Sequence, residues 1–253
     1  MFYIFDTNIW IDLSRGTLSC EELVGRAGLP IALAPFIINE FMKGLVTGGE
    51  GPFERNREAV KCMASTRPEI LELPKSFIFR ILWNVREGVA TVRPQHYRTL
   101  IDLLVPSRSL EEFLRKTDKS ESDWKRLRDL RSIHDEVLNK ELGSLTPLAE
   151  RASLKSLTRH MVRGYELGGL LPDPDFFETT FSAAVEFLKT SIVQVRNGAK
   201  PRKNNPGMYV DSQLFWYLAD PRAVVVTRED FSTEIRVSPQ KARIISYEQF
   251  RTL

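Results

Sequence analysis

Short apolar runs alternate with helical stretches at both ends of the chain. The runs Phe2–Phe5 and Ile31–Ala34 are continuous and short, which is typical of strands buried on both faces, and Ile70–Leu73 is a third candidate. Near the other end, Ala223–Thr227 is rich in β-branched residues and Arg243–Ser246 is a further strand candidate. Strands that alternate with helices predict an α/β fold, here a three-layer α/β/α arrangement around a central parallel sheet.

Helix signals separate these strands. A first helix is expected to begin with the stretch Ile9–Leu13, and Thr7 or Asn8 can cap it. Pro35 can occupy the first turn of a helix that runs to Lys43 and is followed by a glycine-rich stretch. Further helices are expected at Cys20–Ala27, Lys75–Glu87, Val210–Ala219 and a short stretch after Ser246.

The middle of the chain has a different pattern. From about residue 94 to residue 197 the spacing is helical and no strand signal stands out. One apolar stripe at helical spacing, which we interpret as core, comprises Phe177, Phe181, Val185, Leu188, Ile192 and Val195. The pattern therefore predicts an all-helical insertion over residues 89–204 between two parts of one α/β core, residues 1–88 and 205–253.

Composition narrows the class of protein. With 42% hydrophobic and 27% charged residues among 253, the chain is not globally disordered, and its net charge of +3 does not by itself indicate a nucleic-acid binder. The longest apolar stretches, near Pro30–Ile38, are half the length needed to span a membrane, and the N-terminus lacks a basic region and meets Asp6 early, unlike a signal peptide. Cys20 and Cys62 show no CxxC pairing, and the three histidines are widely spaced. We therefore expect a cytoplasmic protein with reduced cysteines and neither a zinc site nor a disulfide framework.

Acidic residues recur where the predicted strands end. Asp6 follows the first strand, Glu40 lies one helical turn beyond the second, and Asp211 opens the helix before Ala223–Thr227. Glu229 and Asp230 follow that last strand. Carboxylates that converge on one sheet edge repel each other unless cations neutralise them, and their hard oxygen atoms favour Mg²⁺ or Mn²⁺. Since no Ser, Cys or His stands out beside them as a nucleophile, water is the expected nucleophile.

Several of these segments together resemble the PIN domain, a metal-dependent nuclease fold. The motifs are FDTNIWIDL at 5–13, PFIINEFMKG at 35–44, YVDSQLFWYLA at 209–219, VVVTREDF at 224–231 and ARIISYEQF at 242–250. The resemblance covers about residues 1–88 and 205–253 and says nothing of the helical insertion, which makes the interval between the second and third acids longer than in compact members.

The resemblance implies roles for individual residues. Asp6, Glu40 and Asp211 match the family's first three metal-site acids, which are also its catalytic residues. Asn8 matches an amide that orients the first aspartate, and Thr227 matches the hydroxyl after the penultimate strand.

The fourth acid departs from the family pattern. It usually stands two residues after that threonine, where this chain has Glu229 rather than an aspartate, and the adjacent Asp230 is the alternative. Asp12 also fits the local pattern, but its offset of six residues from Asp6 turns it away on a helix, so we interpret it as a surface or supporting residue.

Two features near or inside the insertion have competing interpretations. Arg196, Lys200, Arg202 and Lys203 form a run without an acid just before Asp211. This run is either a solvated connector or a loop whose Lys200, Arg202 and Lys203 bind substrate phosphates. Arg128 and His134 have the spacing of the Arg–His motif of HEPN ribonucleases, which cleave without metal, although such a pair also arises by chance.

The sequence thus predicts a Mg²⁺- or Mn²⁺-dependent ribonuclease that hydrolyses phosphodiester bonds, with single-stranded RNA as the expected substrate. The alternative is a catalytically silent PIN-like scaffold that binds RNA or a protein. The resemblance is compatible with a toxin that has an antitoxin partner, with a defence or processing enzyme, and with a homodimer.

Overall fold

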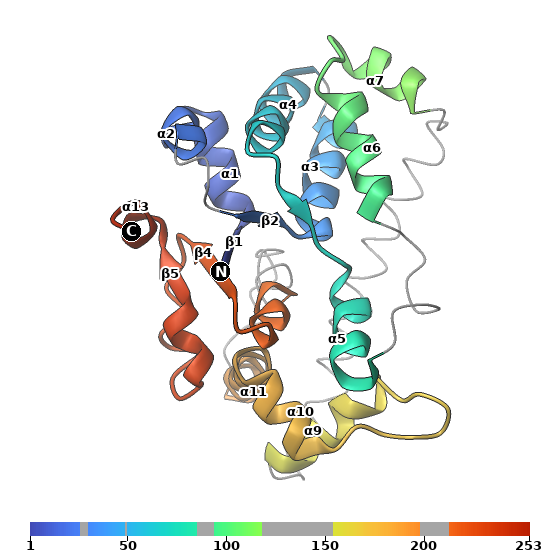
Figure 1. Ribbon diagram of the computed structural model, residues 1–253, viewed down its shortest axis with the longest axis vertical. Helices are drawn as coiled ribbons and strands as arrows, with labels where there is room; N and C mark the ends of the chain where they lie inside the picture. The colour runs from blue at the N-terminus through green and yellow to red at the C-terminus, as the bar shows by residue number, and fades with distance from the viewer. Residues whose placement is uncertain (26–29, 49, 85–93, 118–153, 198–212) are drawn as a thin grey trace.

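The computed structural model describes residues 1–25, 30–48, 50–84, 94–117, 154–197 and 213–253 (Figure 1). Its five parallel strands lie in the order β3-β2-β1-β4-β5. They are β1 (Phe2–Phe5), β2 (Ile31–Leu33), β3 (Glu69–Ile70), β4 (Ala223–Thr227) and β5 (Ile244–Ser246). The predicted α/β class with a parallel sheet is confirmed.

The strand order reverses at the centre of the sheet. From β1 the chain moves outward to β2 and β3, and it later returns to the other side of β1 with β4 and β5. Phe5 pairs with Val226 at the carboxyl ends of β1 and β4, and β4 is buried throughout. In open parallel sheets, ligands bind outside the carboxyl ends of the strands where the order reverses. The segments that follow β1 and β4 therefore occupy the expected place for a functional site.

Helices cover both faces of this sheet (Figure 1). On one face, the Phe5 ring packs edge-on against Trp10 of α1 (Thr7–Ser14) and Phe250 of α13 (Tyr247–Arg251), with ring centroids 5.4 and 5.0 Å apart. On the other lie α11 (Ser182–Arg196) and the 3-10 helix η1 (Tyr217–Ala219), which ends the helical stretch that begins at Gln213. A second 3-10 helix, η2 (Pro239–Arg243), leads into β5. The aromatic side chains between the layers supply much of the buried apolar area.

The region after β2 contains more helix than expected. α3 (Pro35–Gly48) runs five residues beyond Lys43, and α4 (Glu50–Ser65) begins within the glycine-rich stretch. Phe41 of α3 and Phe53 of α4 are both buried in the core, so tertiary packing outweighs the low helix propensity of glycine. The remaining helices of this half are α2 (Cys20–Gly25) and α5 (Pro74–Trp83).

The described part of the predicted insertion is helical and packs directly on the α/β core. It comprises α6 (Pro94–Leu104), α7 (Leu110–Lys116), α9 (Leu154–Arg163), α10 (Pro174–Thr180) and α11. Leu104, Phe113 and Phe181 belong to the same continuous hydrophobic core as Phe5. Phe181 itself leaves helical geometry (φ −112°, ψ 35°), so the predicted stripe is divided between α10 and α11.

The expectation of reduced cysteines is wrong. Cys20 at the start of α2 and Cys62 in the last turn of α4 form a disulfide, with their Cα atoms 6.1 Å apart. Two cysteines separated by 42 residues carry no pairing signal in the sequence, because it is the packing of α1 against α4 that brings the start of α2 near Cys62. Within the described parts of the chain, no helix has the length and apolar character needed to cross a membrane.

Candidate metal and active site

Asp6 lies at the carboxyl end of β1 and is the N-cap of α1. Its Oδ1 atom accepts the backbone N–H of Ile9 at 2.9 Å, a role that the sequence had suggested for Thr7 or Asn8. The shift by one or two residues follows from the strand, which delivers Asp6 in extended conformation (φ −70°, ψ 167°) at the first turn of the helix. The carboxylate is only 2% exposed.

The strand next to β1 contributes a hydroxyl to this carboxylate. Thr227, the last residue of β4, donates its hydroxyl to Oδ2 of Asp6 at 2.5 Å, and the Arg228 backbone N–H approaches the same oxygen at 3.3 Å. Thr227 is buried as well. The structure thus brings together two residues that lie 221 positions apart and that the sequence had assigned to one site.

Glu40 is held by a second threonine. Thr7, which directly follows Asp6, donates its hydroxyl to Oε2 of Glu40 at 2.5 Å. Glu40 is half-buried on α3, the helix that follows β2. Asp6 follows β1, and its neighbour Thr7 bonds Glu40, which follows β2. The acids after two neighbouring strands are therefore linked through Thr7. Sequence reasoning offered Thr7 only as a helix cap and missed its contact with Glu40, although its position in the DTN motif was a usable signal.

The two candidates for the fourth acid have different surroundings. The Glu229 backbone N–H donates to the Thr227 hydroxyl at 3.0 Å, and the residue is half-buried. Asp230 is exposed, and its Oδ1 atom accepts the backbone N–H of Ser232 at 2.8 Å, which lowers the pKa of the Asp230 carboxyl. These contacts favour Glu229 as the acid of the site and leave Asp230 as a turn residue.

Burial raises the pKa of the Asp6 carboxyl. Hydrogen bonds from Thr227, Ile9 and Arg228 oppose that rise, and the negative charge of Glu229 adds to it. The last effect means that Glu229 lies close enough to Asp6 for their charges to repel. A buried carboxylate beside a second acid is the electrostatic setting that a bound cation would relieve.

Several predicted site residues fall elsewhere. Asn8 is exposed, and its amide makes no hydrogen bond to the Asp6 side chain. Asp211 lies outside the described residues, as do Lys200, Arg202 and Lys203 and the alternative Arg128–His134 pair.

Asp12 was expected at the surface or as a supporting residue, and the structure excludes the surface position. It is 9% exposed on α1, and its carboxylate forms an ion pair with the Arg228 guanidinium. The six-residue offset does turn Asp12 away from the Asp6 carboxylate, but toward the segment after β4 rather than toward open solvent. The sequence analysis gave Arg228 no role. Its position directly after Thr227 in the VVVTREDF motif was a signal that it lies near the site.

The donor set fits a hard divalent cation. The side chains gathered here are carboxylates and hydroxyls, which suit Mg²⁺ or Mn²⁺ rather than softer metals. No Lys or Arg side chain among the described residues forms an ion pair with Asp6. Within the same residues, no three His, Cys, Asp or Glu side chains already form a compact group able to hold a metal ion. Of the four acids that the PIN-like resemblance assigns to a metal site, Asp6, Glu40 and Glu229 are described, and Asp211 would be the fourth.

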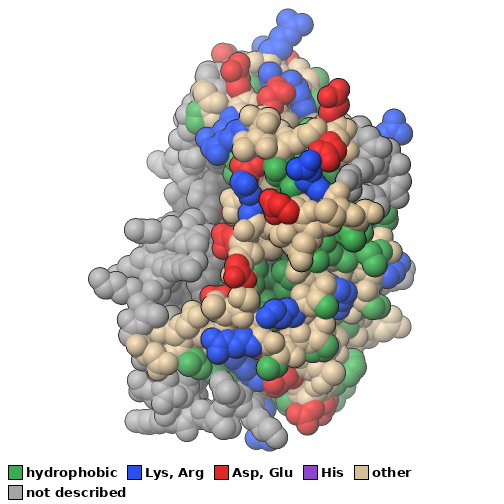
Figure 2. All heavy atoms as spheres, turned by 90° about the vertical axis from the view of Figure 1, so that its left-hand side faces the viewer, with side chains coloured by type: hydrophobic (Ala, Val, Ile, Leu, Met, Phe, Trp, Pro, Cys, Tyr) green, Lys and Arg blue, Asp and Glu red, His purple; other side chains and the backbone are tan. Residues whose placement is uncertain are grey.

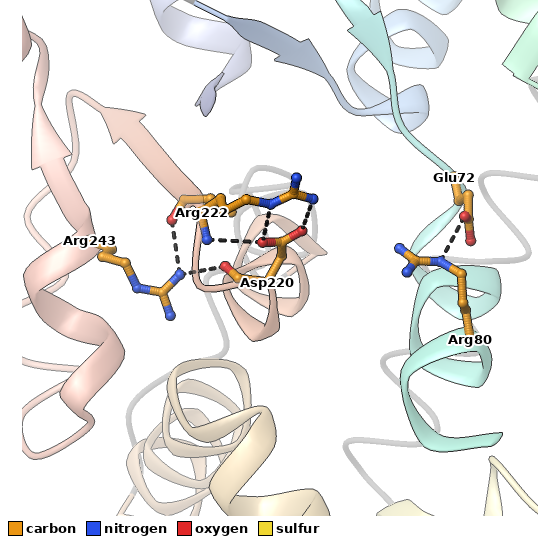
Figure 3. Close-up of polar contacts among 6 residues, drawn as sticks. Glu72, Arg80, Asp220, Arg222 and Arg243 are labelled. Carbon is orange, nitrogen blue, oxygen red and sulfur yellow. Dashed lines mark hydrogen bonds and ion pairs between the residues drawn. The ribbon is translucent and has the colours of Figure 1, made fainter. Parts of the chain in front are cut away.

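The opposite end of the sheet has a different arrangement of charges. Figure 2 shows basic and acidic side chains interleaved over the described part of one face. At the amino end of β4, Asp220 accepts two hydrogen bonds from the Arg222 guanidinium at 3.1 and 2.8 Å, and Arg243 donates to the backbone carbonyls of Asp220 and Ala223 (Figure 3). There the acid is neutralised by arginine, whereas Asp6 at the carboxyl end is held by neutral donors.

Comparison of the chain with models of protein families, with curated proteins and with solved structures finds no match in any of the three.

The different surroundings of Glu229 and Asp230 lead to a prediction. Glu229→Gln should weaken Mn²⁺ binding by about tenfold or more, because a direct ligand matters at least as much as the groups that support it. Asp230→Asn should change the affinity little, since its carboxylate serves the Ser232 turn. Calorimetric titration of Mn²⁺ into both variants measures this, and the reverse order of effects would assign the fourth acid to Asp230.

Proposed function

We propose that this protein is a PIN-like ribonuclease that uses Mg²⁺ or Mn²⁺ to hydrolyse phosphodiester bonds in single-stranded RNA. The observation that carries the proposal is the buried Asp6 carboxylate at the point where the strand order reverses, bonded to the Thr227 hydroxyl that also accepts the Glu229 backbone N–H. The PIN-like motifs of the sequence supply the second support, because they contain each of these residues.

In this proposal Asp6, Glu40, Asp211 and Glu229 hold one or two cations. A bound Mg²⁺ or Mn²⁺ supplies a Lewis acid that activates water and offsets the negative charge that develops on the phosphate. The protein's own contribution is orientation, since Thr7 and Thr227 fix the carboxylates of Glu40 and Asp6 before any ligand arrives. Both cysteines are in the disulfide, so neither provides a thiolate nucleophile, in keeping with attack by water.

Metal removal tests the proposal directly. Protein treated with a chelator and then dialysed should cleave single-stranded RNA at no more than the background rate, and added Mn²⁺ or Mg²⁺ should restore cleavage while Ca²⁺ serves as a control for charge alone. Gel analysis of end-labelled RNA follows the reaction. Cleavage that persists without metal would favour the Arg128–His134 alternative, and the absence of both cleavage and Mn²⁺ binding would favour a silent scaffold.

A further inference from the structure

Arg228 and Asp12 form an ion pair beside the proposed site. Neither residue belongs to the proposed metal-site acids, so the ion pair needs a separate explanation. The Arg228 guanidinium contacts Oδ2 of Asp12, which lies near the end of α1. The Asp12 side chain is 12% exposed and that of Arg228 is 42% exposed. An arginine whose guanidinium is paired with a nearly buried carboxylate is more ordered than a surface arginine that is surrounded by solvent.

This ion pair fixes the same segment that Asp6 fixes. Thr227 donates its hydroxyl to Asp6, and the Arg228 backbone N–H approaches Asp6 as well. The Arg228 side chain then reaches Asp12, in the last turn of α1. Residues 227–229 are therefore attached to α1 at both of its ends, by Asp6 at the N-cap and by Asp12 near the C-terminus.

Glu229 depends on this attachment for its position. Its backbone N–H is bonded to Thr227, but among the described residues no side chain holds its carboxylate. The Thr227 hydroxyl that accepts this N–H is the one that bonds Asp6, so the backbone of residues 227–229 sets where the Glu229 carboxylate lies relative to Asp6. We propose that the Asp12–Arg228 ion pair makes Arg228 a positioning residue, which holds the Glu229 carboxylate where a divalent cation can bind it. The inference rests on the proposed function, since it assigns Glu229 to the metal site.

Mn²⁺ affinity, measured by calorimetry on the full chain, tests this inference without requiring RNA cleavage. Arg228→Gln should raise the Kd for Mn²⁺ about tenfold, as is common when a group that supports a metal ligand is lost. Arg228→Lys keeps the charge and should recover part of that loss, although Lys cannot reproduce the planar donor geometry of Arg.

Arg222→Gln is the matched control. Arg222 directly precedes β4, as Arg228 directly follows it, and it also pairs with an aspartate (Figure 3). The substitution removes the same charge and an equivalent ion pair about 20 Å away along the strand, at roughly 3.3 Å per residue. It should leave the Kd for Mn²⁺ within twofold of wild type.

A double-variant cycle separates positioning from general damage to the fold. If Arg228 acts through Glu229, adding Arg228→Gln to Glu229→Gln should raise the Kd for Mn²⁺ no further, because the positioned ligand is already gone. A merely structural role would give independent, multiplicative effects. If Arg228→Gln fails to fold, Asp12→Asn breaks the same ion pair with a side chain of equal size and carries the test.

The possible results are distinct. If Asp6→Asn abolishes Mn²⁺ binding but neither Arg228→Gln nor Asp12→Asn alters the Kd, the positioning role is wrong and the metal site stands. Multiplicative effects in the cycle would also overturn the positioning role. If Asp6→Asn leaves Mn²⁺ binding unchanged, the proposed function and this inference both fail.

Discussion

Replacing Asp6 with Asn is expected to lower the rate of metal-dependent RNA cleavage at least roughly 100-fold, since a metal ion contributes several kcal/mol to such reactions and each 1.36 kcal/mol is a factor of ten. The substitution nearly preserves the shape of the side chain. An amide oxygen can still accept the Ile9 N–H, and the Thr227 hydroxyl can accept from the amide nitrogen instead of donating. The loss should therefore reflect the missing negative charge rather than a collapsed site.

Single-turnover cleavage of a labelled RNA in saturating Mn²⁺ measures this effect. Asp220→Asn is the matched control, because it makes the same change in an aspartate at the opposite end of the sheet and should retain the wild-type rate. Full activity of Asp6→Asn would contradict the assignment of this residue to the metal site.

Asp6→Asn should lower the cleavage rate but raise the thermal stability of the metal-free protein. Because burial raises the pKa of Asp6, the metal-free folded state binds its proton more tightly than the unfolded state does. The Asp6 carboxyl therefore contributes its full stabilisation at pH values below its pKa in the unfolded state. That contribution is lost as the pH rises through its pKa in the folded state. At neutral pH, Asp6→Asn should thus unfold at a higher temperature than metal-free wild type, and the difference should shrink in acid.

Added Mn²⁺ should make wild type unfold at a higher temperature than Asp6→Asn. Mn²⁺ at about 100 times its Kd stabilises a folded state by about 2.7 kcal/mol, which corresponds to a Tm increase of about 5–10 °C for a chain of this size. Only wild type should show this increase. Thermal melts with and without Mn²⁺ at pH 5 and pH 7 check both effects, and an equal Mn²⁺ response in the two proteins would contradict them.

The sequence pattern was sufficient to place Asp6 and Thr227 at the ends of strands, but not to show that their side chains bond each other. Asp6 and Thr227 each end an apolar run, so their positions at strand ends followed from the pattern alone. Their contact depends on β4 pairing with β1, a long-range choice that no local pattern encodes. The ion pair between Asp12 and Arg228 depends on that same choice of neighbouring strand.

Local signals also failed where tertiary packing opposed them. The sequence pattern ended a helix at Lys43 before the glycine-rich stretch, yet α3 and α4 extend into that stretch because the two helices pack together and bury Phe41 and Phe53 in the core. The disulfide is the extreme case. Its cysteines are far apart in sequence, and they meet because α4 packs against α1, directly before the start of α2.

Loss of the Cys20–Cys62 disulfide is expected to lower the free energy of unfolding by about 4 kcal/mol. The bond closes a loop across a sequence separation of 42, and the entropy that such a closure removes from the unfolded chain gives this magnitude. For a chain of this length the change corresponds to a Tm decrease of about 8–16 °C. The closed loop contains β2 and α3, so the constraint acts on the segment that carries Glu40.

The disulfide-free variant should combine Cys20→Ser with Cys62→Ala. Cys62 is buried in the apolar core, where a serine hydroxyl would lack a partner, whereas Cys20 is half-buried near the surface. Chemical denaturation of both proteins with and without a dithiol reductant measures the effect. Reductant should bring wild type close to the variant and leave the variant unchanged, because the variant has no bond to reduce. Wild type that unfolds at the same denaturant concentration in both conditions, with free thiols detected by alkylation, would mean that the cysteines are not joined in solution.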